Sequence, residues 1–224
     1  MSETDLQLGG GYIYQSRCAI LLALNYFFEP VRYNPTLFDL IHGFLGRVAQ
    51  IHLEGEDRES GVDLEDINLL NAAGDRRILI QVKTKKERGK QWTLADPLLR
   101  QALYKFYASR FLTEQPGGTR FVFLTNRPFN PALEQVRSAI QEGTVDRCEP
   151  ADRLCQCVAR YAQKEKQASI DGGRFRAMLA RTKLVEYLAV DVVKANLQAK
   201  LQADGRRDWQ QAYDRLYEHL SDQS

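Results

Sequence analysis

The sequence predicts one α/β domain, residues 1–224, with a core of about 11–145 and a mainly helical part of about 146–224. Apolar residues recur at helical spacing near the N-terminus, alternate as in strands between about 48 and 83, and return to helical spacing afterwards. The chain is 44% hydrophobic and 27% charged, as is usual for a globular protein. This composition excludes a disordered tail, a collagen-like fibre and a highly basic packaging protein.

Two helices are expected first. The earlier one covers residues 12–28, and Pro30 ends its pattern because proline cannot continue a helix. The second covers about 35–47. Its apolar face consists of Leu37, Leu40, Ile41, Phe44 and Leu45.

Three strands should follow. Residues 48–54 and 64–70 alternate between apolar and polar, whereas residues 77–83 (RILIQVK) are apolar on both faces. Residues 71–75 (NAAGD) have turn chemistry, so the second and third strands are predicted to form a hairpin.

A helix and a strand complete the expected core. The helix covers about 96–113 and ends before the Pro-Gly-Gly of residues 116–118, and the continuous apolar run 121–125 predicts a buried strand. The order is therefore helix, helix, strand, hairpin, helix, strand. Further helices are expected, and residues 184–190 fit a strand or a helix, of which we favour the strand. The helical ranges are 131–141, 152–166, 175–179, 192–201 and 209–220.

Polar residues at the strand ends suggest a site. Glu54 ends the first strand, Asp66 lies in the second, and Gln81 and Lys83 share a face of the third because residues two apart do so in a strand. The hairpin should bring Asp66 near Gln81 and Lys83. Carboxylates with an amide oxygen can bind Mg²⁺, and a lysine can orient water or stabilise a phosphorane, so the set suits phosphodiester hydrolysis. The bare pattern fits a solvated hairpin edge better, but the apolar strand around Gln81 and the αβ unit after it favour a site.

Four stretches carry a family resemblance: GYIYQ at 11–15, Leu53-Glu54, Glu65-Asp66-Ile67 and IQVKT at 80–84. Together they span roughly residues 10–125. In pattern and order they resemble the PD-(D/E)XK nucleases, which have the restriction-endonuclease-like fold. More narrowly, they resemble the DNA endonuclease domain of the SAVED-linked, CD-NTase-associated effectors of bacterial CBASS anti-phage defence.

The resemblance implies a role for each matching residue. Asp66 corresponds to the metal-binding aspartate, Glu54 to the acidic residue on the preceding strand, and Gln81 to the middle position of the (D/E)XK motif. These three would bind Mg²⁺, or Mn²⁺ in its place. Lys83 is the lysine of the motif, and Gln15 matches a polar residue that faces the same site.

Two features of this motif need a choice. Alternation places only one of Glu65 and Asp66 on the site face, and we choose Asp66; Asp63 is the alternative if the strand register slips. Gln81 carries one negative charge fewer than a carboxylate, which should weaken binding of a second metal ion. A two-metal mechanism is therefore not assumed.

A basic loop follows Lys83 and suits contacts with phosphate groups, although a solvated charged loop explains it equally well. Trp92 at its end is expected to pack on a sugar or a base. The net charge of +2 conceals two blocks, because residues 54–66 contain seven acids and one base whereas residues 76–105 contain nine bases and two acids. The predicted DNA-binding residues are Lys85, Lys86, Arg88 and Lys90.

The expected function is metal-dependent cleavage of double-stranded DNA, with low sequence specificity, as the effector of a prokaryotic anti-phage system. The resemblance implies a homo-oligomer and a fused or separate sensor or ATPase module, such as a SAVED domain, an NTPase or a HerA-like ATPase. Two alternatives stay open: a non-catalytic nucleic-acid-binding or assembly module on the same fold, and a nuclease that cleaves RNA.

The expected location is the cytoplasm, without a membrane partner. The first eight residues are polar and acidic, unlike a secretory signal, and the longest apolar stretch is far shorter than a membrane span. The four cysteines are unevenly spaced, so reduced thiols are expected rather than disulfides or a zinc site.

Overall fold

The computed structural model describes residues 40–46, 48–53, 56–57, 62–63, 67–85, 90–115 and 117–186, together with the single residues Cys18, Ala199, Gln202, Gln211 and Arg215. Cys18 is helical and buried. Except for these single positions, the helices predicted at 12–28, 192–201 and 209–220 lie outside the described residues.

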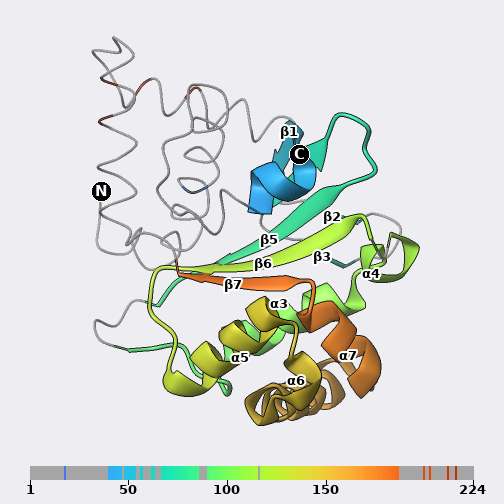
Figure 1. Ribbon diagram of the computed structural model, residues 1–224, viewed down its shortest axis with the longest axis vertical. Helices are drawn as coiled ribbons and strands as arrows, with labels where there is room; N and C mark the ends of the chain where they lie inside the picture. Colours follow the sequence, from blue (N-terminus) through green and yellow to red (C-terminus); the bar gives the residue numbers. More distant parts are fainter. Residues whose placement is uncertain are drawn as a thin grey trace.

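A five-stranded mixed sheet forms the centre of the fold, in the order β1-β4-β5-β6-β7 (Figure 1). β1, β4 and β5 are antiparallel neighbours, and β5, β6 and β7 are parallel. The prediction of a mixed α/β fold is thus confirmed. The strand bounds are Val48–Leu53 (β1), Ile67–Asn71 (β4), Arg77–Lys83 (β5), Thr119–Thr125 (β6) and Thr182–Glu186 (β7).

The predicted hairpin is present as β4 and β5. Its turn requires Gly74, whose φ of 71° belongs to the left-handed region that glycine adopts without strain. The Asn71 side chain closes the turn, because Nδ2 donates to Asp75 Oδ1 (2.7 Å) and Oδ1 accepts from the Arg76 N–H (3.1 Å). β5 has the predicted bounds and is buried over five consecutive residues, which confirms a strand that is covered on both faces.

A second, smaller ladder lies in the chain between β1 and β4. β2 (Glu56–Asp57) and β3 (Val62–Asp63) pair with each other as a separate two-stranded sheet. This two-stranded ladder was not predictable from the sequence, because strands of two residues have no detectable periodicity. Most of the acidic block counted above belongs to this part of the chain.

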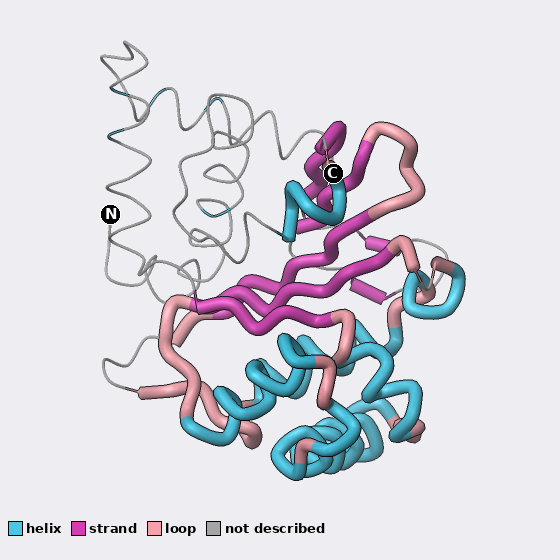
Figure 2. Tube along the Cα trace, in the orientation of Figure 1, coloured by secondary structure: helices cyan, strands magenta, loops and turns pink. Residues whose placement is uncertain are grey.

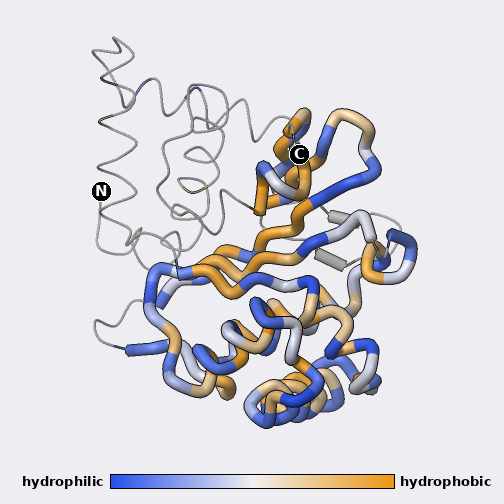
Figure 3. Tube along the Cα trace, viewed as in Figure 1, coloured by the Kyte–Doolittle hydropathy of each residue, from blue (hydrophilic) through white to orange (hydrophobic). Residues whose placement is uncertain are grey.

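Helices cover one face of the large sheet (Figures 1 and 2). Leu79, Phe121, Phe123 and Leu184 belong to the sheet and share a hydrophobic core with residues of these helices. Figure 3 shows apolar residues concentrated along the central strands, with hydrophilic residues on the outer helical surface. The helix bounds are Pro97–Ala108 (α3), Phe111–Glu114 (α4), Pro131–Glu142 (α5), Val145–Arg147 (η2, a 3₁₀-helix), Glu149–Lys166 (α6) and Gly172–Leu179 (α7).

Local sequence explains the start of α5. Pro131 occupies the first turn, where its missing N–H costs nothing, and the Asn130 side chain accepts a hydrogen bond from the Leu133 N–H (3.0 Å). The predicted helix at 131–141 is therefore confirmed to within one residue.

Two predicted helices differ in detail. The helix expected at 96–113 is divided into α3 and α4, because Ser109 has an extended backbone (φ −60°, ψ 131°). This break lets Phe111 and Leu112 bury their side chains. The described part of the helix expected at 35–47 contains a π-helix, η1 (Ile41–Leu45), which ends at Gly46 with φ of 68°.

The favoured strand near the end of the described chain is present as β7, which pairs with β6 in parallel. It begins two residues earlier than predicted, at Thr182. Within the described ranges, no helix is long and apolar enough to cross a bilayer.

Candidate active site at the end of the third predicted strand

Three strands meet in one row of paired residues at the predicted site. Leu53 of β1 pairs with Ile67 of β4, which in turn pairs with Ile80 of β5. Both pairings are antiparallel, so the next level on the same side of this row is one residue further along β1 and β5 and one residue earlier in β4. The three predicted metal ligands occupy those next positions in the sequence: Glu54, Asp66 and Gln81.

Of the predicted catalytic set, the described residues include Gln81 and Lys83. Glu54, Asp66 and Gln15 lie outside them. Leu53 and Ile67 are the sequence neighbours of Glu54 and Asp66, so the row supports a common location for these two residues and Gln81. The catalytic roles of all five residues stay predictions.

The Gln81 side chain is fully buried on the same face of β5 as Leu79. Within the described part of the chain, neither its Nε2 nor its Oε1 has a hydrogen-bond partner. An unpaired buried polar group costs about 1–3 kcal/mol. The oxygen of an unpaired amide can coordinate a cation, so the Gln81 side chain is chemically suited to act as a metal ligand.

Lys83 is the last residue of β5 and is half-buried. It lies two residues beyond Gln81 and therefore projects from the same face, whereas the buried Val82 projects from the other. Lys83 is in register with Thr125 of β6, and Thr125 with Glu186 of β7. Thus Gln81 and Lys83 are placed together by the geometry of one strand.

The strand register gives no support to Asp63 as the alternative to Asp66. β4 and β5 pair without interruption from Ile67 to Leu70. Asp63 lies in β3, where it pairs with Glu56 in the separate ladder. A slip of β4 by one residue would also reverse which of its faces is buried.

Lys85, the first of the predicted DNA-binding residues, has close protein partners. Its Nζ donates to Asp96 Oδ2 (2.7 Å) and to the Gln91 carbonyl (2.8 Å), and it lies 4.8 Å from the centroid of the Trp92 ring. The Lys85 and Asp96 side chains are 17% and 16% exposed. Lys85 therefore joins the end of β5 to the start of α3, and its contact with DNA stays a prediction.

Of the other predicted DNA-binding residues, Lys90 is exposed, and Lys86 and Arg88 lie outside the described residues.

The expectation that Trp92 packs on a sugar or base is wrong. The side chain is fully buried, and its ring meets Phe123 edge-on at 5.1 Å. The Trp92 backbone is held by the segment before α5, because its N–H donates to the Pro128 carbonyl (2.9 Å) and its carbonyl accepts from the Asn130 N–H (2.8 Å). This partner segment is more than thirty residues away in the sequence, and local pattern could not reveal it.

Asn126 is a residue that the sequence analysis missed. Its side chain is almost fully buried and bonds both backbone groups of Lys85: Oδ1 accepts from the N–H (3.0 Å), and Nδ2 donates to the carbonyl (3.4 Å). Asn126 thus extends the pairing of β5 and β6 beyond Lys83. The available signal was a polar residue directly after the apolar strand 121–125.

Replacement of Lys85 tests whether it mainly anchors the loop. Lys85→Ala removes an ammonium bonded to a largely buried carboxylate, so we expect the free energy of unfolding to fall by about 1–3 kcal/mol. Chemical denaturation measures that loss. Lys90→Ala, at an exposed position of the same loop, should leave stability within about 0.5 kcal/mol of the parent. Equal stability of Lys85→Ala and the parent would contradict the anchoring role.

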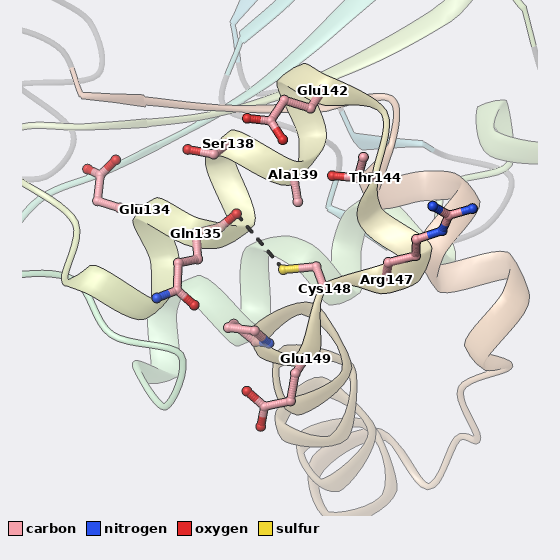
Figure 4. Close-up of a pocket in the computed structure, with 10 residues that line it drawn as sticks. Glu134, Gln135, Ser138, Ala139, Glu142, Thr144, Arg147, Cys148 and Glu149 are labelled. Carbon is pink, nitrogen blue, oxygen red and sulfur yellow. Dashed lines mark hydrogen bonds between the residues drawn. The ribbon is translucent and has the colours of Figure 1, made fainter.

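An open depression of about 550 Å³ lies between α5 and the start of α6. Its lining includes Glu134, Glu142 and Glu149, and Figure 4 shows their carboxylates well separated and pointing in different directions. Among the described residues, no group of three or more His, Cys, Asp or Glu side chains could hold a metal ion. The depression therefore offers no alternative metal site.

The four cysteines form no disulfide bonds in the structure. Cys148 at the edge of the depression makes a long contact from its Sγ to the Gln135 carbonyl (3.9 Å; Figure 4). Burial raises the pKa of the Cys155 thiol, and the nearby Arg176 guanidinium opposes this effect only in part. Cys155 thus stays protonated to higher pH than an ordinary thiol, which does not suit a nucleophile.

Comparison with known proteins gives little further guidance. No protein-family model matches the chain, and no curated protein matches it. A similar solved structure is that of the Acinetobacter baumannii Cap4 SAVED/CARF-domain containing receptor with the cyclic trinucleotide 3'3'3'-cAAA, at 14% sequence identity and a TM-score of 0.41. The similarity covers 81% of this chain and 38% of that one. At this level the likeness assigns neither a family nor a function.

Proposed function

We propose that the chain is a Mg²⁺-dependent endonuclease that cleaves double-stranded DNA with low sequence specificity. The observation that carries the proposal is the row Leu53–Ile67–Ile80, because each predicted metal ligand is adjacent to one of its members. If the antiparallel ladders continue by one residue, Glu54, Asp66 and Gln81 share one face and one level of the sheet.

The donor set suits a hard divalent cation. Glu54 and Asp66 would supply carboxylate oxygens, and Gln81 would supply a neutral amide oxygen that lacks any described hydrogen-bond partner. A bound Mg²⁺, or Mn²⁺, would polarise the scissile phosphate and lower the pKa of a coordinated water. Lys83, on the face of Gln81, would stabilise negative charge that develops on the phosphate oxygens.

Several parts of the proposal rest on the family resemblance. These are the choice of double-stranded DNA, the role as an effector in prokaryotic anti-phage defence, and a partner sensor or ATPase module, fused or separate. Cleavage of both strands would also require a homo-oligomer that presents two sites to one duplex. Parallel assays on duplex DNA and on RNA separate these two substrates.

The experiment that tests the proposal is cleavage of supercoiled plasmid. The parent protein should nick and linearise the plasmid with Mg²⁺ and leave it intact with EDTA. Asp66→Ala should abolish cleavage, because it removes a charged metal ligand. Asp63→Ala is the matched control, since it removes an equivalent carboxylate three residues earlier, and it should retain cleavage. Full activity of Asp66→Ala would refute the site.

A non-catalytic nucleic-acid-binding module is the second candidate. Gln81 at a position that carries a carboxylate in the (D/E)XK motif favours it, because a neutral ligand binds a cation less strongly. The same assay decides between the two. A module of this kind would bind duplex DNA equally well with Mg²⁺ or EDTA and would cleave neither plasmid nor linear DNA.

A further inference from the structure

An arginine lies near the start of each of three parallel strands, at the edge of the sheet that is remote from the candidate site. Arg76 directly precedes β5, Arg120 is the second residue of β6, and Arg181 directly precedes β7. We call these three residues the arginine row. β5 has seven residues, so at about 3.3 Å per residue its two ends are roughly 20 Å apart.

Arg76 and Arg120 both stack near one aromatic ring. Their guanidinium carbons lie 5.8 Å and 4.5 Å from the centroid of Phe44, in η1. Arg76 Nη1 also donates to the Phe44 carbonyl (2.9 Å), and Arg120 Nη1 donates to the Thr119 carbonyl (3.2 Å). These contacts orient both guanidinium groups and leave several of their N–H donors available.

No ion pair joins Arg76 or Arg120 to a carboxylate in the described part of the chain. Asp75 is next to Arg76 in the sequence, but its Oδ1 accepts from Asn71 Nδ2 (2.7 Å). Two adjacent cations are therefore held near a ring without a described anion between them.

Arg181 adds a third positive charge. Its guanidinium donates to the Leu112 carbonyl (3.3 Å) and to the Ala177 carbonyl (3.3 Å). Burial lowers the pKa of Arg181, and the charge of Arg120 lowers it further; burial also lowers the pKa of Arg120. Arg120 and Arg181 are thus like charges in a partly desolvated place, where a bound anion would be stabilising.

We propose that the arginine row binds phosphate groups of the duplex DNA backbone. The choice of duplex DNA as the ligand rests on the proposed function. The location of the phosphate-binding surface rests on the contacts of the arginine row. Guanidinium groups match the geometry of phosphate oxygens. Neighbouring strands are about 4.8 Å apart, so the row spans roughly 10 Å, or about three phosphates at a rise of 3.4 Å.

The test is the salt dependence of duplex binding. Binding of a labelled 24-base-pair duplex, a length of about two helical turns, is measured in EDTA over a series of salt concentrations, so that no cleavage occurs. Arg76→Gln with Arg120→Gln should reduce the slope of log K against log salt by about 2, because each lost phosphate contact removes about 0.9. Duplexes of unrelated sequence should weaken to a similar extent.

The matched control is Arg153→Gln with Arg160→Gln. Both arginines are exposed on α6, away from the sheet, and the pair removes the same net charge (Figure 1). The control should retain the parent slope. An equal reduction in both double variants would show a general charge effect and would overturn the proposal, as would an unchanged slope in the row variant.

Two further variants separate binding from folding. Arg76→Gln alone changes an exposed turn residue and should reduce the slope by about 1. Arg120→Lys keeps the charge and should keep the slope, and thermal melting followed by circular dichroism checks each fold. A parent protein that cleaves duplex DNA while the row variant keeps its slope refutes the arginine row alone. A parent that binds no duplex at all refutes both proposals.

Discussion

Lys83→Ala is expected to lower the rate of Mg²⁺-dependent DNA cleavage by about 10²–10³-fold. Lys83 ends β5, shares the face of Gln81 and is half-buried. In the proposed function, its ammonium would stabilise the negative charge that develops on the phosphate during hydrolysis. Single-turnover cleavage of an end-labelled duplex measures this step separately from product release. Binding of the same duplex in EDTA should change little, because the loss is one of catalysis.

Lys183→Ala is the matched control for Lys83. Lys183 is also a half-buried lysine of the same sheet, but it pairs with Val122 and therefore projects from the opposite face. Its replacement should leave the cleavage rate within about twofold, since a surface substitution away from the site changes little. A Lys83→Ala protein that cleaves at the parent rate would show that this lysine is wrongly assigned, even if Asp66→Ala is inactive.

Gln81→Met should abolish or strongly reduce cleavage and at the same time stabilise the fold. Methionine has a similar length and no amide, so it removes two buried polar atoms that lack described partners. We expect the free energy of unfolding to rise by about 1–3 kcal/mol in metal-free buffer. Chemical denaturation with EDTA present measures the stability, and the plasmid assay measures the activity.

Gln81→Glu provides the opposite change at the same atom positions. It introduces a buried carboxylate, which should destabilise the metal-free protein, because burial of an unpaired charge is unfavourable. With Mg²⁺ present, the added charge should lower the metal concentration that gives half-maximal cleavage.

A Gln81→Met protein that is less stable than the parent yet cleaves normally would instead indicate that the amide has a structural role.

Local patterns predicted much of the described fold correctly. The β-rich composition of residues 77–83, apolar on both faces, matched β5, and the Asn71–Asp75 turn matched the β4–β5 hairpin. These features depend on interactions between residues close in sequence, such as turn hydrogen bonds and the two-residue period of a strand. For the same reason the shared face of Gln81 and Lys83 could be inferred from spacing alone.

Contacts between distant segments were not predictable in this way. Trp92 lies in a charged stretch, and only its pairing with residues 128–130 buries it. The anchoring of Lys85 by Asp96 and Asn126 likewise joins segments separated by eleven and forty-one residues. Such contacts depend on how strands and helices pack, and no short sequence pattern specifies that packing.

Most strands and helices, the hairpin turn and the spacing of Gln81 and Lys83 could be inferred from the sequence, because each follows from interactions within a few residues. The three-dimensional structure was needed to show that Leu53, Ile67 and Ile80 form one row, that Trp92 belongs to the core, and that arginines 76, 120 and 181 lie near the starts of neighbouring strands. Strand register and helix packing join segments that are far apart in the chain, so no local pattern specifies them.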